Sequence, residues 1–296
     1  MKINFSEKIK GITGLILLAL IFAVLGAVVR LLEPYQGVIK QIHYRVVIGA
    51  AILLVFYVRQ IRFKKLRNMP QREIYIVFMR SIILVPAGIL WVKAITMSKL
   101  FNVTLIDSIP ASSILGWLIL REKFSVEKFG WTLFAFLGVV IVSLKNISGS
   151  FTLGIGELYL VASVFLFAFR NVTRRWHKDY LNDHEITFFM LLIPAIFFFF
   201  METREPWIWQ QRFNLFIVLL TFFGGLLTLW NFFLTNYGFK RVEAVLGGNI
   251  LQLEAMFGLL LGFLLFRESP TIIEIIGAII LSFSVYRLNL LESGIK

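Results

Sequence analysis

The sequence predicts an all-α integral membrane protein with ten transmembrane helices, arranged as two inverted five-helix repeats. Hydrophobic residues make up 58% of the 296 positions and charged residues only 16%, at a mean hydropathy of +0.83. Soluble chains are nearer a quarter charged. The apolar residues fall into runs of about 20, the length at which a helix crosses a hydrocarbon layer of roughly 30 Å. Similar residue patterns also recur in the two halves of the chain.

The ten predicted spans are separated by charge clusters and by Pro, Gly and Asn residues. In the first half they cover Gly11–Leu32, Val38–Val58, Ile74–Met97, Phe101–Leu120 and Phe129–Leu144. In the second half they cover Leu153–Thr173, Ile186–Met201, Phe213–Asn236, Val242–Phe266 and Thr271–Leu288. Such continuous runs argue against a transmembrane β-barrel, whose strands alternate over about ten residues. The N-terminal run lacks a convincing cleavage site, so we expect it to remain as the first helix.

The positions of the basic residues predict the orientation. Lys and Arg gather in the loops on the side that holds both termini, most densely between Arg59 and Arg72. Because cytoplasmic loops carry the excess of Lys and Arg, we expect a multi-pass protein of the cell (inner) membrane with both termini in the cytoplasm. The net charge of +13 therefore does not indicate a nucleic-acid partner, since no soluble domain remains to bind one.

The composition also limits the chemistry. Without cysteine the chain cannot form a disulfide, a zinc knuckle, an iron–sulfur cluster or a thiol nucleophile. We also find no Asp-rich metal motif and no Gly-x-Ser-x-Gly nucleophile motif. We therefore expect no enzyme activity, no metal and no cofactor. Because the loops are short and leave little surface for another protein, we predict no protein partner. A homodimer remains a possible assembly.

Two short patterns recur between the halves at nearly the same offset. Phe22–Ala23 near the end of the first span returns as Phe167–Ala168 in the sixth, and each pair is followed by an arginine. Leu120–Glu122 after the fourth span returns as Phe266–Glu268 after the ninth. Two matches at nearly one offset indicate an internal repeat rather than a chance likeness of apolar helices.

The repeat divides the chain into two units, residues 1–147 and 148–296, each with five spans. Because five is odd, the second unit must lie upside down in the bilayer relative to the first. Inverted repeats of this kind are typical of secondary transporters.

The chain resembles the ten-helix EamA-type branch of the drug/metabolite transporter superfamily over nearly its whole length. The residues that carry this resemblance are Ala19 and Phe22–Ala23 in the opening helix, Arg45, Arg80, Pro110 ahead of Glu122, and Arg267–Pro270 before Gly277. The family more often has Trp-Gly in the opening helix and Glu-Pro where this chain has Glu254–Ala255. The resemblance implies a central cavity built mainly from spans 1, 3, 4, 6, 8 and 9, with spans 5 and 10 peripheral. It also implies transport by rocking between inward-open and outward-open states.

Polar side chains inside the apolar spans are the candidates for a substrate site. An ionised group at the centre of a membrane helix costs roughly 2.5 to 3.5 kcal/mol, so it persists where it faces protein, water or a substrate path. Helical spacing places the polar residues of spans 6, 8 and 9 on one face of each helix. The candidate substrate-binding residues are Arg45, Arg80, Asp107, Tyr159, Ser163, Arg170, Thr228, Asn231, Asn249, Gln252 and Glu254.

Structural roles compete with each candidate. Arginines near helix ends can extend to the lipid phosphates, and Thr and Asn stripes more often hold helices together than bind ligands. Among the histidines, His177 and His184 fall in a basic loop, where we expect a solvated surface, and His43 is a weaker candidate for a proton site.

These observations together predict a secondary transporter that moves a small polar metabolite across the cytoplasmic membrane by alternating access. Arg45, Arg80 and Arg170 suit a carboxylate or phosphate, while Asp107 or Glu254 can meet an amine or carry a proton. An amino acid or a related zwitterion or anion fits both sets, and relatives suggest S-adenosylmethionine as another such substrate. The alternatives are an exporter of lipophilic drugs or lipids, favoured if phenylalanines line the cavity, a membrane-embedded enzyme, and a scaffold or receptor.

Overall fold

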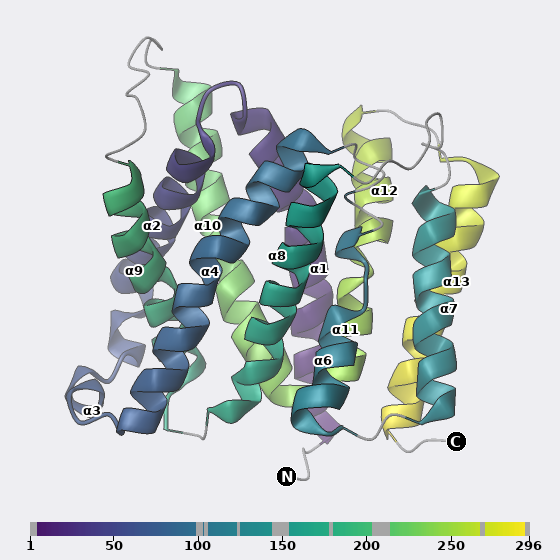
Figure 1. Ribbon diagram of the computed structural model, residues 1–296, viewed down its shortest axis with the longest axis horizontal. Helices are drawn as coiled ribbons and strands as arrows, with labels where there is room; N and C mark the ends of the chain where they lie inside the picture. The colour runs from purple at the N-terminus through teal and green to yellow at the C-terminus, as the bar shows by residue number, and fades with distance from the viewer. Residues whose placement is uncertain are drawn as a thin grey trace.

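The computed structural model describes residues 5–98, 103, 106–122, 125–143, 154–177, 180–202, 214–266 and 270–293. Within these ranges the regular structure is helical, with no strand. Figure 1 shows the long helices standing side by side and running between the two ends of the molecule, as expected for helices that cross one bilayer. Eight described segments are long and apolar enough to span a membrane. The first three residues of the Arg267–Pro270 motif, 267–269, lie outside the described residues.

The described helices follow the ten predicted spans in order. In the first half they are α1 (Phe5–Leu32), α2 (Val38–Tyr57), α4 (Gln71–Met97), α6 (Ala111–Leu120) and α7 (Val126–Ser143). In the second half they are α8 (Ile155–Val172), α9 (Asp183–Glu202), α10 (Leu215–Arg241), α11 (Ala244–Leu251) with α12 (Glu254–Phe266), and α13 (Ile272–Ser293). Shorter elements are η1 (Val58–Gln60), α3 (Phe63–Arg67) and η3 (Thr173–Trp176).

Two spans are interrupted at corresponding places in the two halves. In the fourth span the regular helix α6 begins only after Pro110, because proline has no N–H to continue the hydrogen-bond ladder. In the ninth span α11 ends at Leu251, and the N–H groups of Gln252 and Leu253 turn back to carbonyls three residues earlier. Broken helices leave backbone groups free at membrane depth, where they are tolerated only beside protein or a cavity.

The arrangement in space agrees with an even number of crossings. Figure 1 shows that α1 begins and α13 ends at the same end of the molecule, which we call the terminus end. The most extensive helix contacts all join the halves: α7 with α13, α1 with α10, α4 with α8, and α2 with both α9 and α10. Helices α7 and α13, the fifth and tenth spans, pack against each other at one edge (Figure 1), so they are peripheral.

Large apolar side chains cover the outside of the helices. Phe56 is 74% exposed, Phe200 65% and Ile279 62%. In contrast, fully buried side chains include Arg80, Arg170 and several Ser, Thr and Asn residues. An apolar exterior around a polar interior is the reverse of a soluble protein and suits a lipid environment. The chain is therefore a multi-pass membrane protein.

The predicted polar faces point into the bundle. On α10, Thr228, Asn231 and Thr235 are all buried, and on α8 Ser163 and Arg170 are buried as well. Each Thr hydroxyl on α10 donates to the carbonyl four residues before it, so the helix satisfies these groups itself. Hydroxyls that are satisfied locally can face a cavity without a further partner.

Candidate functional site

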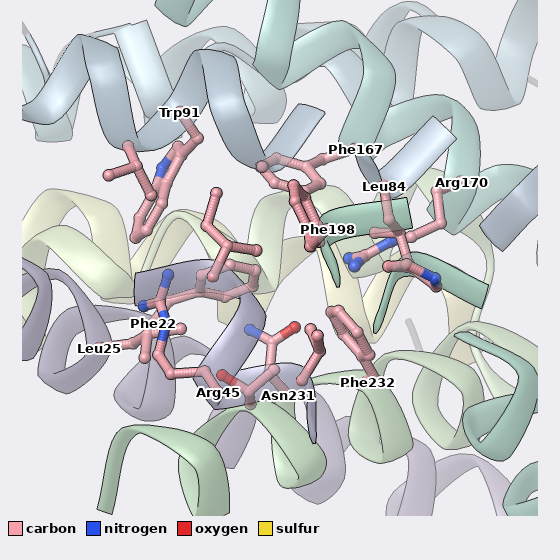
Figure 2. Close-up of a pocket in the computed structure, with 16 residues that line it drawn as sticks. Phe22, Leu25, Arg45, Leu84, Trp91, Phe167, Arg170, Phe198, Asn231 and Phe232 are labelled. Atoms are coloured by element: carbon pink, nitrogen blue, oxygen red, sulfur yellow. The ribbon is translucent and has the colours of Figure 1, made fainter. Parts of the chain in front are cut away.

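A first cavity of about 60 Å³ lies between the halves, where α1, α2, α4, α8, α9 and α10 meet. Figure 2 shows Arg45 and Arg170 well apart, on two sides of this cavity, with Phe167, Phe198 and Phe232 between them. Most of its wall is apolar; the polar side chains that line it are Arg45, Arg170, Thr228 and Asn231. Buried polar groups in an otherwise apolar cavity are the usual arrangement of a small-molecule site.

Arg45 is 4% exposed and reaches the cavity from α2. Its Nε donates to the carbonyl of Gln41 at 3.0 Å, but its Nη1 has no hydrogen-bond partner. The side chain fits against α10 because residue 224 is a glycine: a Cβ atom there would lie 3.1 Å from Cδ of Arg45. The small residue on α10 therefore makes room for a buried cation on α2.

Arg170 is 1% exposed and reaches the same cavity from α8. Its Nε and Nη2 donate to Oδ1 of Asn171 at 3.1 and 2.8 Å, and its guanidinium carbon lies 5.2 and 5.6 Å from the ring centres of Phe167 and Phe232. Its Nη1, like that of Arg45, has no partner. Within the described residues neither arginine forms an ion pair with a carboxylate.

A second cavity of about 70 Å³ adjoins the first, since Phe22, Trp91 and Phe167 line both. It lies where the interrupted spans meet α1, α4 and α8. Asp107, Gln252 and Glu254 line it, together with Ser112 and Asn171. The indole N–H of Trp91 donates to Oδ2 of Asp107 at 3.3 Å, and Nε2 of Gln252 donates to the carbonyl of Ser108 at 2.8 Å. The second cavity is thus the more polar of the two.

Seven of the predicted site residues therefore line the two cavities: Arg45, Arg170, Thr228 and Asn231 in the first, and Asp107, Gln252 and Glu254 in the second.

The other four candidates do not line either cavity. Arg80 is fully buried nearby and donates to the carbonyl of Arg170 at 3.2 Å and to Oδ1 of Asn236 at 2.8 Å. Asn249 donates to the hydroxyls of Ser113 and Thr132. Ser163 donates to the carbonyl of Leu160, and Tyr159 packs against the apolar core. In this structure Arg80 and Asn249 join helices to one another, whereas the hydroxyl of Ser163 is satisfied within its own helix.

Sequence reasoning missed the aromatic walls and Asn171. Phe22, Trp91, Phe167, Phe198 and Phe232 sit in continuous apolar runs, where no local pattern separates a ring that faces a cavity from one that faces lipid. The sequence did contain a signal for Asn171 as a site residue, because this second polar residue directly follows Arg170 near the end of the span.

Ion pairs join the two halves at the terminus end. The pairs are Glu7–Arg241 at 2.8 Å, Arg62–Glu185 at 2.7 Å, Glu122–Arg175 at 3.1 Å and Lys128–Glu243 at 2.9 Å, and His177 adds a hydrogen bond to Glu73 at 2.7 Å. At the opposite end, Nδ1 of His43 contacts Glu202, and the Tyr44 hydroxyl donates to the same carboxylate at 3.0 Å. Side-chain contacts therefore connect the two halves at both ends of the molecule, and the two cavities lie between these ends.

The expectation that His177 and His184 lie at a solvated surface is wrong. His177 is 7% exposed between the start of α4 and the end of η3. Burial, followed by the charges of Arg80, Arg174 and Arg72, lowers the pKa of His177 to about 2, so the neutral ring donates from Nδ1 to Glu73. His184 lies between the rings of Tyr57 and Phe233, at 5.1 and 4.6 Å. Both rings contact neighbouring helices, because η3 and the first turn of α9 pack against the bundle.

Comparison with known proteins agrees with this architecture. The model of the EamA-like transporter family matches the chain twice, over residues 9–144 and 154–290. The chain belongs to the EamA-like transporter family. It is therefore a membrane transporter of the drug/metabolite transporter superfamily, as the resemblance predicted. No curated protein matches the sequence. A solved structure described only as "Crystal structure of protein" has the same fold, with a TM-score of 0.78 at 15% identity over 97% of this chain and 98% of the other.

In this EamA-like transporter each cavity takes one charged side chain from each matched repeat. Arg45 comes from the first repeat and Arg170 from the second; Asp107 comes from the first and Glu254 from the second. Both cavities therefore lie across the boundary between the two repeats, where a rocking motion would change their shape.

Proposed function

We propose that this transporter is a secondary transporter that moves a small organic anion or zwitterion, such as an amino acid, by alternating access. The observation that carries the proposal is the pair Arg45 and Arg170, buried in one cavity with an unpartnered Nη1 on each. A buried charge without a partner is strongly unfavourable. A substrate carboxylate supplies the missing acceptor, because a guanidinium binds carboxylates through paired N–H donors.

The aromatic side chains of the first cavity favour a substrate that carries an apolar or flat group beside its carboxylate. Phe22, Phe167, Phe198, Phe232 and Trp91 enclose the space between the two arginines. Aromatic rings of this kind bury an apolar or flat group favourably. An amino acid or related acid with an apolar side chain fits this wall better than a fully polar sugar, and S-adenosylmethionine belongs in the same test because it joins a carboxylate to a flat base.

The aromatic wall also favours a second candidate, an exporter of lipophilic drugs or lipids. Such a substrate would use the phenylalanine rings and leave the two guanidinium groups without an acceptor. Because desolvated arginines without an anion cost free energy, we favour the organic anion.

Transport by alternating access requires both cavities to become larger than they are in this structure. At about 60 and 70 Å³ each holds only a few water molecules, so substrate entry requires one end to open. We propose that residues 1–147 and 148–296 rock against each other as the two moving units. We also propose that the terminus end faces the cytoplasm of the cell that holds the protein in its inner membrane, because that end carries most of the Lys and Arg.

The test is counterflow in proteoliposomes with labelled leucine, phenylalanine, glutamate, malate, S-adenosylmethionine and AMP. We expect a carboxylate-bearing compound to exchange, and Arg45→Ala or Arg170→Ala to reduce that exchange at least about tenfold, as loss of a charge-assisted contact implies. Lys93→Ala, which removes an exposed cation from α4, is the matched control. If both arginine variants exchange as fast as the wild type, or if only uncharged lipophilic compounds move, the proposal is wrong.

A further inference from the structure

The second cavity presents hydrogen-bond acceptors that the anion site does not use. The carboxylates of Asp107 and Glu254 line it. Gln252 is 4% exposed and lines it as well; its Nε2 donates to Ser108, while its Oε1 has no partner. Three acceptor side chains therefore share one small space. A set of this composition calls for a ligand that donates hydrogen bonds or carries positive charge.

Among the described residues that line the second cavity, none is basic. The helices around it contribute Phe22 from α1, Trp91 from α4, Val164, Phe167, Ala168 and Asn171 from α8, and Gly248 and Leu251 from α11, all of them neutral. Asp107 and Glu254 are the titratable residues among those that line it. Arg170 lines the adjoining cavity, and its Nε and Nη2 are bound to Asn171.

The two carboxylates share one small cavity, since both Asp107 and Glu254 line it. Two like charges in a small space of low dielectric constant are both ionised only at a high cost in free energy when no cation is present, so a pair of this kind favours sharing one proton. A proton also fits a cavity of about 70 Å³, whereas a bound metal cation would need a fuller shell of oxygen ligands.

We propose that Asp107 and Glu254 together bind one proton that this transporter moves in each cycle, with Oε1 of Gln252 as a further acceptor for it. The inference rests on the proposed transport function. Asp107 belongs to the first matched repeat and Glu254 to the second, so rocking changes the distance between them. The pair binds the proton when the halves bring the carboxylates together, and releases it when they separate and water enters.

The proton site and the anion site share wall residues, so a change in one site affects the other. Phe22, Trp91 and Phe167 form part of both walls. Asn171 lines the second cavity and holds the guanidinium of Arg170, which lines the first. An anion that draws Arg170 away from Asn171 therefore also changes the wall beside the two carboxylates, which is the physical link that proton coupling requires.

The first test needs no substrate. Infrared spectra of the purified protein in lipid vesicles at pH 7 report the carbonyl band of a protonated carboxylic acid. We expect this band in the wild type, its loss in the double variant Asp107→Asn/Glu254→Gln, and its retention in Glu33→Gln, which removes an exposed carboxylate at the end of α1. If the wild type lacks the band, or if the double variant keeps it, the proposal is wrong.

The second test measures coupling. Vesicles that contain a pH-sensitive dye and the labelled compounds of the counterflow panel report protons and substrate together. We expect about one proton per substrate molecule in the wild type and a ratio at least about tenfold lower in Asp107→Asn and in Glu254→Gln. A sodium gradient that drives the wild type in place of the proton gradient overturns the proposal, as does an unchanged ratio. If no panel compound exchanges at all, the transport proposal fails, and the infrared band alone decides whether the proton site exists.

Discussion

At the scale of single residues, Glu122 connects the end of one helix to the beginning of another. Its carboxylate accepts hydrogen bonds from the N–H groups of Ala244 at 2.9 Å and Val245 at 3.2 Å, the first residues of α11, and it pairs with Arg175. The first N–H groups of a helix have no partner within the helix, and the helix dipole favours an anion there. One side chain of the first half therefore satisfies the start of an interrupted span in the second.

Replacing Glu122 should lower stability. We expect Glu122→Ala to reduce the free energy of unfolding by about 1 to 2 kcal/mol, because two buried N–H groups lose their acceptor. Equilibrium unfolding of the purified protein in mixed detergent micelles measures this loss. Glu33→Ala, an exposed carboxylate elsewhere, should change stability by less than about 0.5 kcal/mol. Equal stability of the two variants would contradict the role assigned to Glu122.

At the scale of helices, the contact between α7 and α13 depends on a backbone-to-backbone approach at Gly138. A Cβ atom at this position would lie 2.7 Å from the backbone nitrogen of Leu281 and 2.9 Å from the carbonyl oxygen of Gly277. Helices in membranes associate through such close approaches at small residues, because lipid removes most of the hydrophobic drive between them. Gly130 on the same helix has open space around its Cα.

The two glycines of α7 therefore predict opposite results. Gly138→Ala should destabilise the protein by about 1 to 3 kcal/mol, because neither helix backbone can move aside without losing packing. Gly130→Ala should be neutral or stabilise it by up to about 1 kcal/mol, since alanine favours the helix and meets no neighbour. Thermal unfolding of both variants in the same detergent compares them. A Gly138→Ala protein as stable as Gly130→Ala would mean that the close contact does not hold these helices together.

At the scale of the whole molecule, the ion pairs of the terminus end join the two halves. Arg62 binds both carboxylate oxygens of Glu185 through Nε and Nη2, and Arg241 joins Glu7 of α1 to Asp183 of α9. In the proposed cycle, opening that end requires such pairs to separate. Arg62 is 44% exposed and Glu7 is 40% exposed, so solvent partly screens the Arg62–Glu185 and Glu7–Arg241 pairs, and each can be broken within the cycle.

Removing these pairs should favour the state open at the terminus end. Because the chain has no cysteine, Ser112→Cys places a single thiol in the wall of the second cavity. We expect Arg62→Ala/Arg241→Ala to accelerate labelling of that thiol by a charged maleimide in nanodiscs about two- to fivefold. Lys10→Ala removes a pair with Glu7 that lies within α1 and should leave the rate unchanged. If the rate does not rise in the arginine variant, these pairs do not restrict opening.

Part of the candidate site was readable before any tertiary structure. Arg45, Asp107, Arg170 and Glu254 stand out because ionised side chains are costly in apolar runs, and all four line a cavity. Arg80 stands out for the same reason, yet it lies outside both cavities, bound to Arg170 and Asn236. Periodicity assigns a face of a helix, but it does not say whether that face meets a cavity or another helix.

Composition, run length and the recurrence of short patterns were sufficient for the ten spans and the inverted repeat, because lipid imposes its thickness and polarity on the sequence itself. The family came from the resemblance of particular residues to a known pattern. The division of the charged residues into an arginine cavity and an adjoining carboxylate cavity depended on the tertiary structure. Side chains from helices far apart in the sequence, such as Asp107 and Glu254, meet only after the halves pack, and no local pattern records which groups will face each other across that boundary.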